Sequence, residues 1–138
     1  MNFSIRQLDH VVLRVVDLER SVAFYCGVLG CTIARRRDDL GMLHLQAGTS
    51  MIDLVSLEGE VGRRGGAGPG LEARNVDHLC LRVEPFDGDA LIAYLRESSV
   101  ELLGPIQTRF GAQGSGPSLY MRDPDGNVVE LKGPVSAP

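Results

Sequence analysis

The sequence predicts an α+β fold built from two tandem βαβββ modules, and three observations support this prediction. The stretch Leu8–Val15 returns almost unchanged as Val76–Val83, about half the chain later, with Asp, His, Leu, Arg and Val in register. Both copies have the short, β-branched, apolar pattern of a strand. Each copy is followed by helical spacing and then by short apolar segments, so the repeat extends to the architecture.

The first module is expected over residues 5–57. After the strand that carries His10, Asp17 is a good helix N-cap, and apolar residues spaced by three and four predict a helix over 18–29. Gly30 stops this helix. Strands are then expected at residues 32–37, 42–46 and 51–57, separated by polar or glycine-containing turns.

A glycine-rich segment, residues 58–75, is expected to link this module to a second one over 76–132. It contains no Gly-Lys-Ser/Thr, so it is not a nucleotide-binding P-loop. A mobile connector and a loop that closes over a ligand are both open readings. The two modules are expected to form one compact domain.

The second module repeats the plan, with a strand at 76–83 and a helix at about 90–98 behind the caps Asp87 and Asp89. A strand is expected at 100–102, followed by a glycine-rich stretch over 104–117. Strands at 118–122 and 128–132 flank Asp123-Pro124-Asp125-Gly126-Asn127, which is typical of a tight turn. This turn is too short for a calcium loop.

Composition bounds the kind of protein. The net charge is −4 and the arginines are scattered apart from the triplet at 35–37, so we expect no nucleic acid and no anionic membrane as partner. No apolar run is long enough to span a membrane, and the first residues do not resemble a signal peptide. Three cysteines without a CxxC pair indicate a reducing compartment, so we expect a cytoplasmic protein.

Each module offers one histidine and one carboxylate in matching positions. His10 and His78 lie in the repeated strand, and Asp53 and Glu130 stand alone between aliphatic residues in the last strand of each module. A buried carboxylate needs a partner such as an arginine or a metal. Two His and two carboxylates suit Ni²⁺, Zn²⁺, Mn²⁺ or Fe²⁺ with positions left open for substrate. A satisfied core histidine is the alternative for each His taken singly.

These features together resemble the vicinal oxygen chelate superfamily, which includes glyoxalase I, fosfomycin-resistance proteins, extradiol dioxygenases and bleomycin-binding proteins. The resemblance implies a curved mixed sheet around a metal, usually in a homodimer. The stretches that carry it are Leu8-Asp9-His10, Asp17–Ser21, Phe24-Tyr25, Val28–Gly30, Val76-Asp77-His78 and Asp123–Leu131.

Carried over to this chain, the resemblance implies metal ligation by His10, His78 and Glu130. Asp53 falls on a fourth ligand position, which glyoxalase I fills with the longer Glu. Arg109 and Tyr120 lie in a segment that is similar to the anion-binding loop of fosfomycin-resistance proteins, so they are expected to bind substrate. The remaining histidine, His44, is expected to have no ligand role.

The implied function is a divalent-metal-dependent lyase or isomerase of the glyoxalase (lactoylglutathione-lyase) type. Its substrate would be a small molecule with adjacent oxygens, with a thiol such as glutathione as a possible cosubstrate, and Glu130 or Asp53 would move the proton beside the carbonyl. Three alternatives stay open: a fosfomycin-resistance-type transferase or hydrolase that opens an epoxide, a bleomycin-type binding protein without enzymatic activity, and an extradiol dioxygenase.

Overall fold

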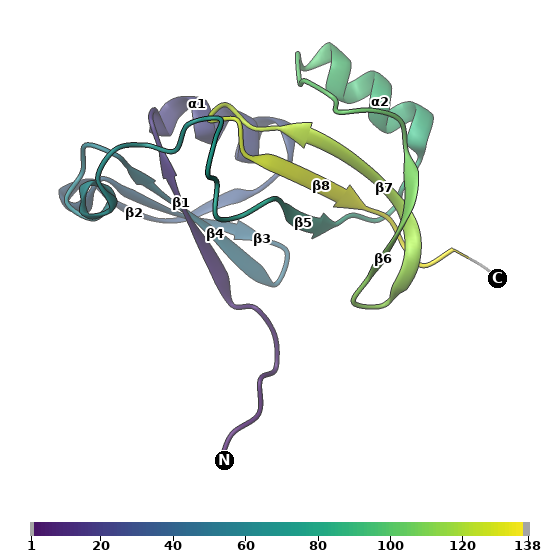
Figure 1. The fold of residues 1–138 in the computed structure, drawn as a ribbon, viewed down its shortest axis with the longest axis horizontal. Helices are drawn as coiled ribbons and strands as arrows, with labels where there is room; N and C mark the ends of the chain where they lie inside the picture. Colours follow the sequence, from purple (N-terminus) through teal and green to yellow (C-terminus); the bar gives the residue numbers. More distant parts are fainter. Residues whose placement is uncertain (1, 137–138) are drawn as a thin grey trace. The chain divides into compact units, whose positions relative to one another are not determined.

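The computed structural model describes residues 2–136. The chain divides into two compact units, Met1–Pro69 and Gly70–Pro138, each with one four-stranded mixed sheet and a helical segment (Figure 1). Both units have the element order βαβββ. The predicted α+β class and the two tandem modules are therefore confirmed.

In the first unit the sheet order is β1-β4-β3-β2, with β1 parallel to β4 and the other pairs antiparallel. The parallel pairing places both ends of the module side by side. Its elements are β1 (His10–Val15), α1 (Leu18–Val22), η1 (Ala23–Val28), β2 (Thr32–Arg37), η2 (Asp38–Leu40), β3 (Met42–Ala47), β4 (Ser50–Ser56) and η3 (Gly62–Gly65).

The helix expected over 18–29 changes type along its length. Asp17 caps α1 by accepting from the backbone N–H of Arg20, as expected, but from Ala23 the chain continues as the π-helix η1. The backbone N–H of Leu29 donates to the carbonyl of Phe24, five residues back, at 3.0 Å. Phe24 and Tyr25 are both buried and meet edge to face at 4.9 Å, so core packing accompanies the wider turn.

The second unit repeats this topology with sheet order β5-β8-β7-β6 and β5 parallel to β8. Asp87 caps its helix, as the sequence predicts. Its elements are β5 (Leu79–Arg82), α2 (Gly88–Glu97), β6 (Gln107–Gly111), β7 (Gly114–Arg122) and β8 (Val128–Lys132).

The strand expected at 100–102 is wrong. Only Leu102 pairs there, through an isolated bridge to Met121, and the second strand of the module is β6, inside the glycine-rich stretch. Gly111 and Gly114 face each other at the end of a tight hairpin, and Gly114 has φ +122°, which favours glycine. The glycines therefore make a hairpin rather than a loop.

Alternation gives each sheet one face that packs on its own helical segment and one polar face. The packed faces form the two cores, and Leu95 of α2 is fully buried. The polar faces carry the candidate site. Buried aliphatic residues of the packed faces are Val15, Leu43, Leu45, Ile52 and Leu54 in the first unit, and Leu119, Met121, Val129 and Leu131 in the second, while Val55 is buried on the face of Asp53.

Part of the predicted linker 58–75 is held by Arg14 on β1. Its Nε donates to the carbonyl of Gly62 at 2.8 Å, and its guanidinium also donates to the carbonyls of Gly66 and Ala67. A Cβ at Gly65 would lie 2.5 Å from Cζ of Arg14, so glycine is needed there for close approach. This part of the linker is anchored to the first module.

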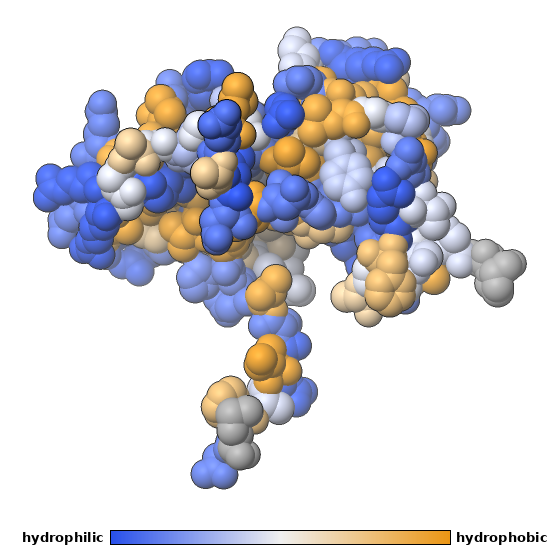
Figure 2. Space-filling view, in the orientation of Figure 1, coloured by the Kyte–Doolittle hydropathy of each residue, from blue (hydrophilic) through white to orange (hydrophobic). Residues whose placement is uncertain are grey.

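The first residues extend away from β1 and expose apolar side chains at Phe3, Ile5 and Leu8 (Figures 1 and 2). Among residues 2–136, no helix is long and apolar enough to cross a membrane.

Candidate functional site

The first module places His10, His44 and Asp53 on the polar face of its sheet. His10 opens β1, and Asp53 on β4 is in register with both Val12 on β1 and His44 on β3. His10 Nδ1 lies 2.7 Å from Oδ1 of Asp9. This hydrogen bond raises the pKa of His10, and the charge of Asp53 adds to the rise. With Nδ1 held by Asp9, Nε2 is the nitrogen left to bind a cation.

One carboxylate oxygen of Asp53 is buried without a hydrogen-bond donor. The residue is 3% exposed, and its Oδ1 lies 3.0 Å from Nδ1 of His44, yet this oxygen receives no hydrogen bond. A buried carboxylate oxygen without a donor is costly unless a cation compensates it. The structure thus brings His44, for which the sequence analysis expects no ligand role, into contact with the predicted ligand Asp53.

The second module makes a matching arrangement around Glu130, which is 5% exposed. His78 Nδ1 lies 2.7 Å from Oδ2 of Asp77, and its Nε2 lies 3.0 Å from Oε2 of Glu130. The ring of Tyr120 meets the ring of His78 edge to face at 5.4 Å. The sequence pattern did not reveal that each histidine would be oriented by the aspartate just before it.

Three further side chains interact around this carboxylate. Partial burial, followed by the charge of Glu130 and a hydrogen bond to it, raises the pKa of Cys80 to about 11. Burial and then Glu130 also raise the pKa of Tyr120, while a hydrogen bond from Arg109 acts in the opposite direction. Arg109 and Tyr120, predicted as substrate-binding residues, therefore lie together beside Glu130.

Lys132 is a residue that sequence reasoning missed. It is 4% exposed, and its Nζ donates to the carbonyls of Arg109 and Gly116, the latter at 3.2 Å. A Cβ at Gly111 would lie 2.7 Å from its Cε, so the glycine makes room for the lysine stem. The clue was available, because a single lysine two residues after Glu130 shares its face of an apolar strand.

In the turn between β7 and β8, the carboxylate of Asp123 accepts hydrogen bonds from other residues of the same turn. Oδ1 of Asp123 accepts from the backbone N–H groups of Asp125 at 2.9 Å and Asn127 at 2.8 Å, and Oδ2 accepts from Asn127 Nδ2 at 2.8 Å. Arg74 adds hydrogen bonds to the Asn127 side chain and the Asp125 carbonyl. The predicted turn is confirmed, and its hydrogen bonds tie β7 to β8.

The candidate ligands are imidazole and carboxylate groups, which are residue types that bind divalent cations. His78 Nε2 and Glu130 Oε2 are 3.0 Å apart, which is the spacing of an ion pair. Asp53 Oδ1 lacks a donor, and both histidines present Nε2. Within residues 2–136, however, no three His, Cys, Asp or Glu residues cluster closely enough to form a cation site. The four-residue ligand set stays a prediction.

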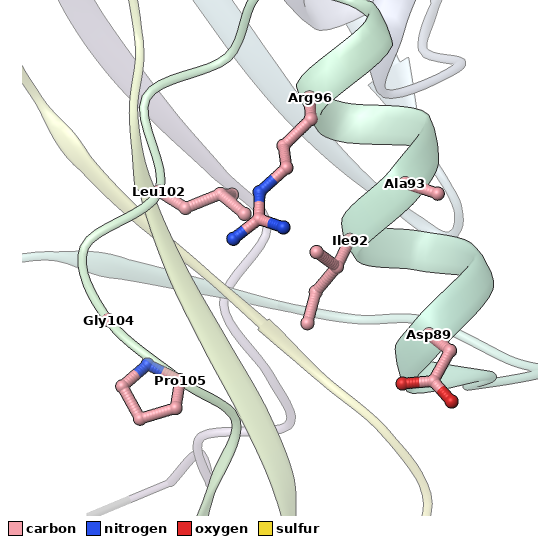
Figure 3. Close-up of a pocket in the computed structure, with 7 residues that line it drawn as sticks. All are labelled: Asp89, Ile92, Ala93, Arg96, Leu102, Gly104 and Pro105. Carbon is pink, nitrogen blue, oxygen red and sulfur yellow. The ribbon is translucent and has the colours of Figure 1, made fainter.

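A pocket in the second unit lies apart from these residues. It is formed between α2 and the following segment, with Ile92 and Arg96 directed toward the segment of Leu102 (Figure 3). None of the predicted site residues lines it. Its lining is Asp89, Ile92, Ala93, Arg96, Leu102, Gly104 and Pro105. The polar faces, with their oriented histidines and buried carboxylates, are better equipped for chemistry.

Comparisons with known proteins agree on one family. Residues 7–131 match the family model of the Glyoxalase/Bleomycin resistance protein/Dioxygenase superfamily. The virulence protein STM3117 of Salmonella typhimurium is 31% identical over 92% of this chain and 83% of its own length. An ethylmalonyl-CoA/methylmalonyl-CoA epimerase of Cereibacter sphaeroides is 29% identical over 93% of this chain and 98% of its own length.

A solved structure is also similar to this chain in fold. The structure of VPC_CASS1, from the mobile metagenome of V. Pseudocholerae, superimposes with a TM-score of 0.77 and 28% identity, covering 99% of this chain and all of its own (100%).

Proposed function

Because the chain belongs to the Glyoxalase/Bleomycin resistance protein/Dioxygenase superfamily, we propose that it is a divalent-metal-dependent isomerase or lyase of the glyoxalase type. Its reaction moves a proton at a carbon beside a carbonyl. The observation that carries this proposal is the repeated pairing of a buried carboxylate with an imidazole nitrogen 3.0 Å away, once in each module. The similarity to an epimerase supports the same reaction class.

The proposed ligands of the ion are His10 and Asp53 of the first module and His78 and Glu130 of the second. The two modules that share one ion belong either to one chain or to two copies in a homodimer. Bound Ni²⁺, Zn²⁺, Mn²⁺ or Fe²⁺ would supply a Lewis acid that polarises two neighbouring oxygens of the substrate. Asp9 and Asp77 orient the histidines for this role.

Glu130 is the proposed base. Its carboxylate takes the proton from the carbon beside the carbonyl, so a C–H bond breaks and an O–H bond forms. The same group then returns the proton, to the neighbouring carbon in a glyoxalase-type reaction or to the same carbon in an epimerisation. The hydroxyl of Tyr120 and the thiol of Cys80 hydrogen-bond to the carboxylate and hold its orientation. Asp53 is the corresponding carboxylate of the first module.

Arg109 is proposed to bind an anionic part of the substrate. Its guanidinium is exposed and reaches Tyr120, so a carboxylate or phosphate held there lies beside Glu130. Nζ of Lys132 donates to the carbonyl of Arg109 and so holds the backbone of that residue. A thiol such as glutathione is a candidate cosubstrate, as in glyoxalase-type chemistry.

The contact between Arg109 and Tyr120 also favours a second candidate, an epoxide-opening reaction of the fosfomycin-resistance type. There the two side chains would hold a phosphonate. The two candidates share the metal ligands and differ in the substrate.

The deciding measurement is metal content by elemental mass spectrometry, on protein purified without chelator or nickel affinity resin. We expect about one divalent ion per chain, lost in His10→Ala and Glu130→Ala and kept in Glu101→Ala, an exposed carboxylate of the same unit. Circular dichroism controls for folding of each variant. No metal in the wild type, even after reconstitution, would overturn the proposal in favour of a ligand-sequestering protein.

Activity is then tested in D₂O with the hemithioacetal of methylglyoxal and glutathione, with methylmalonyl-CoA, and with fosfomycin plus glutathione. Deuterium incorporation beside the carbonyl, lost in Glu130→Gln, is the expected result for proton transfer. If fosfomycin is the single one of these three substrates that is turned over, the second candidate is selected instead. Size-exclusion chromatography with light scattering tests the proposed homodimer.

A further inference from the structure

We propose that the pocket beside α2 is a second ligand site, which binds a small carboxylate with an apolar body. The pocket lies within the second unit and shares no residue with the proposed metal and substrate site, so this inference goes beyond the proposed function and does not depend on it. Its volume is about 650 Å³, which is within the usual range for pockets that bind small molecules.

One wall of the pocket is a single face of α2. The helical residues that line it occupy positions i, i+3, i+4 and i+7, which lie on the same side of a helix. They are Asp89, Ile92, Ala93 and Arg96. Seven residues correspond to about two turns and about 10 Å along the helix axis. This face therefore carries a carboxylate at one end, an apolar middle and a guanidinium at the other end.

The opposite wall is the segment 102–105, which follows α2. Leu102 pairs with Met121 of β7 through an isolated bridge, so this wall is tied to the sheet. Leu102 and Pro105 line the cavity across from Ile92 of the helix (Figure 3). An apolar ligand body between the two walls would remove apolar surface from water on both sides, which favours binding.

Arg96 gives the pocket its preference for an anion. Figure 3 shows its guanidinium extending from α2 toward the segment of Leu102. Among residues 2–136, no carboxylate forms an ion pair with this side chain and no acceptor takes a hydrogen bond from it. Glu101, just before Leu102, pairs with Arg122 instead, at 3.7 Å. A guanidinium can hold a carboxylate through two parallel hydrogen bonds, so the free donors of Arg96 suit the head of such a ligand.

Asp89 limits what can occupy the other end of the pocket. It lies in the first turn of α2, about two turns from Arg96, where a negative charge is favourable for the helix (Figure 3). A ligand long enough to reach it would meet a like charge if it carried a second carboxylate there. The pocket should therefore prefer a monocarboxylate to the dicarboxylate of the same length.

The test is NMR of the ¹⁵N-labelled full chain, titrated with octanoate, whose eight-carbon chain can extend from Arg96 toward Asp89. We expect saturable shifts at Ala93 and Leu102. Arg96→Met should weaken binding about 10-fold, because it removes charge-assisted hydrogen bonds and keeps an apolar stem. Arg20→Met, which removes an exposed arginine from α1 in the other unit, is the matched control and should leave the affinity unchanged.

Octanedioate, the dicarboxylate of the same length, tests the role of Asp89. It should bind the wild type at least about 3-fold more weakly than octanoate, and Asp89→Asn should remove this difference, because the like charge is lost. A difference that persists in Asp89→Asn would refute the selection against dicarboxylates.

Two other results would overturn the site itself. The first is a wild type without saturable shifts at Ala93 and Leu102, including one in which octanoate shifts only residues around Glu130. The second is an octanoate affinity that Arg96→Met leaves unchanged, which would mean that apolar contact alone holds the ligand. The first readout uses wild-type protein, so poor folding of a variant does not remove the test. The proposed metal-dependent function is tested separately by metal content, so either proposal can fail without the other.

Discussion

Replacing Asp123 by Ala should lower the free energy of unfolding by about 3 kcal/mol, because its carboxylate organises the turn between β7 and β8. The residue is 6% exposed and accepts three hydrogen bonds of 2.8–2.9 Å from the turn. A hydrogen bond to a charged group contributes about 1.5–3 kcal/mol. The three share one group and the turn is partly open to water, so the contributions do not add, and about half of the sum is expected.

The assay is urea unfolding followed by far-UV circular dichroism. With a slope of roughly 1.5 kcal/mol per molar urea, the midpoint should fall by about 2 M. Glu97→Ala, which removes an exposed carboxylate at the end of α2, is the matched control and should change stability by less than about 0.5 kcal/mol. A shift of Asp123→Ala no larger than that of the control would show that the turn does not depend on its carboxylate.

Two further predictions concern protonation. Because its pKa is about 11, Cys80 should react with iodoacetamide at pH 8 on the order of 100-fold more slowly than a free cysteine. Glu130→Gln should speed this reaction, because it removes a charge that raises the pKa of the thiol. Mass spectrometry of the labelled peptide measures both rates. In metal-free protein His10 should titrate by NMR above about pH 6.5, since Asp9 favours its charged form, and Asp9→Asn should lower that pKa. Metal affinity should accordingly rise with pH through this titration, and equal affinity at pH 6 and pH 8 would contradict the role of His10.

Much of the architecture could be predicted from local sequence. The repeat around His10 and His78 fixed the two modules, and β2 and β8 have the predicted bounds, Thr32–Arg37 and Val128–Lys132. Helix caps such as Asp17 and Asp87 act through neighbouring backbone groups, so they are readable from sequence.

The errors came where tertiary pairing decides. Residues 107–111 form β6 although they lie within a glycine-rich stretch, because β7 offers a partner and Gly111 leaves space for the stem of Lys132. Local propensity predicted a strand at 100–102, where only Leu102 finds a partner. The change from α1 to the π-helix η1 likewise accompanies the packing of Phe24 and Tyr25.

The candidate site shows the same division. The four predicted ligands were visible as lone polar residues in apolar strands, and both carboxylates are indeed buried. The contact of His44 with Asp53 depends on the register of β3 with β4, which alternation alone does not specify. The orienting contacts of Asp9 and Asp77 depend on side-chain rotamers, on which the sequence pattern is silent.

The burial of Lys132 has a consequence for labelling. It is the chain's single lysine, and its ammonium group is enclosed beneath the β6–β7 hairpin by two carbonyls. Reagents that acylate amines can reach it only when this hairpin lifts away from β8. The rate of acylation at this one side chain would therefore measure how often β6, the strand that carries Arg109, separates from Lys132, without any introduced probe.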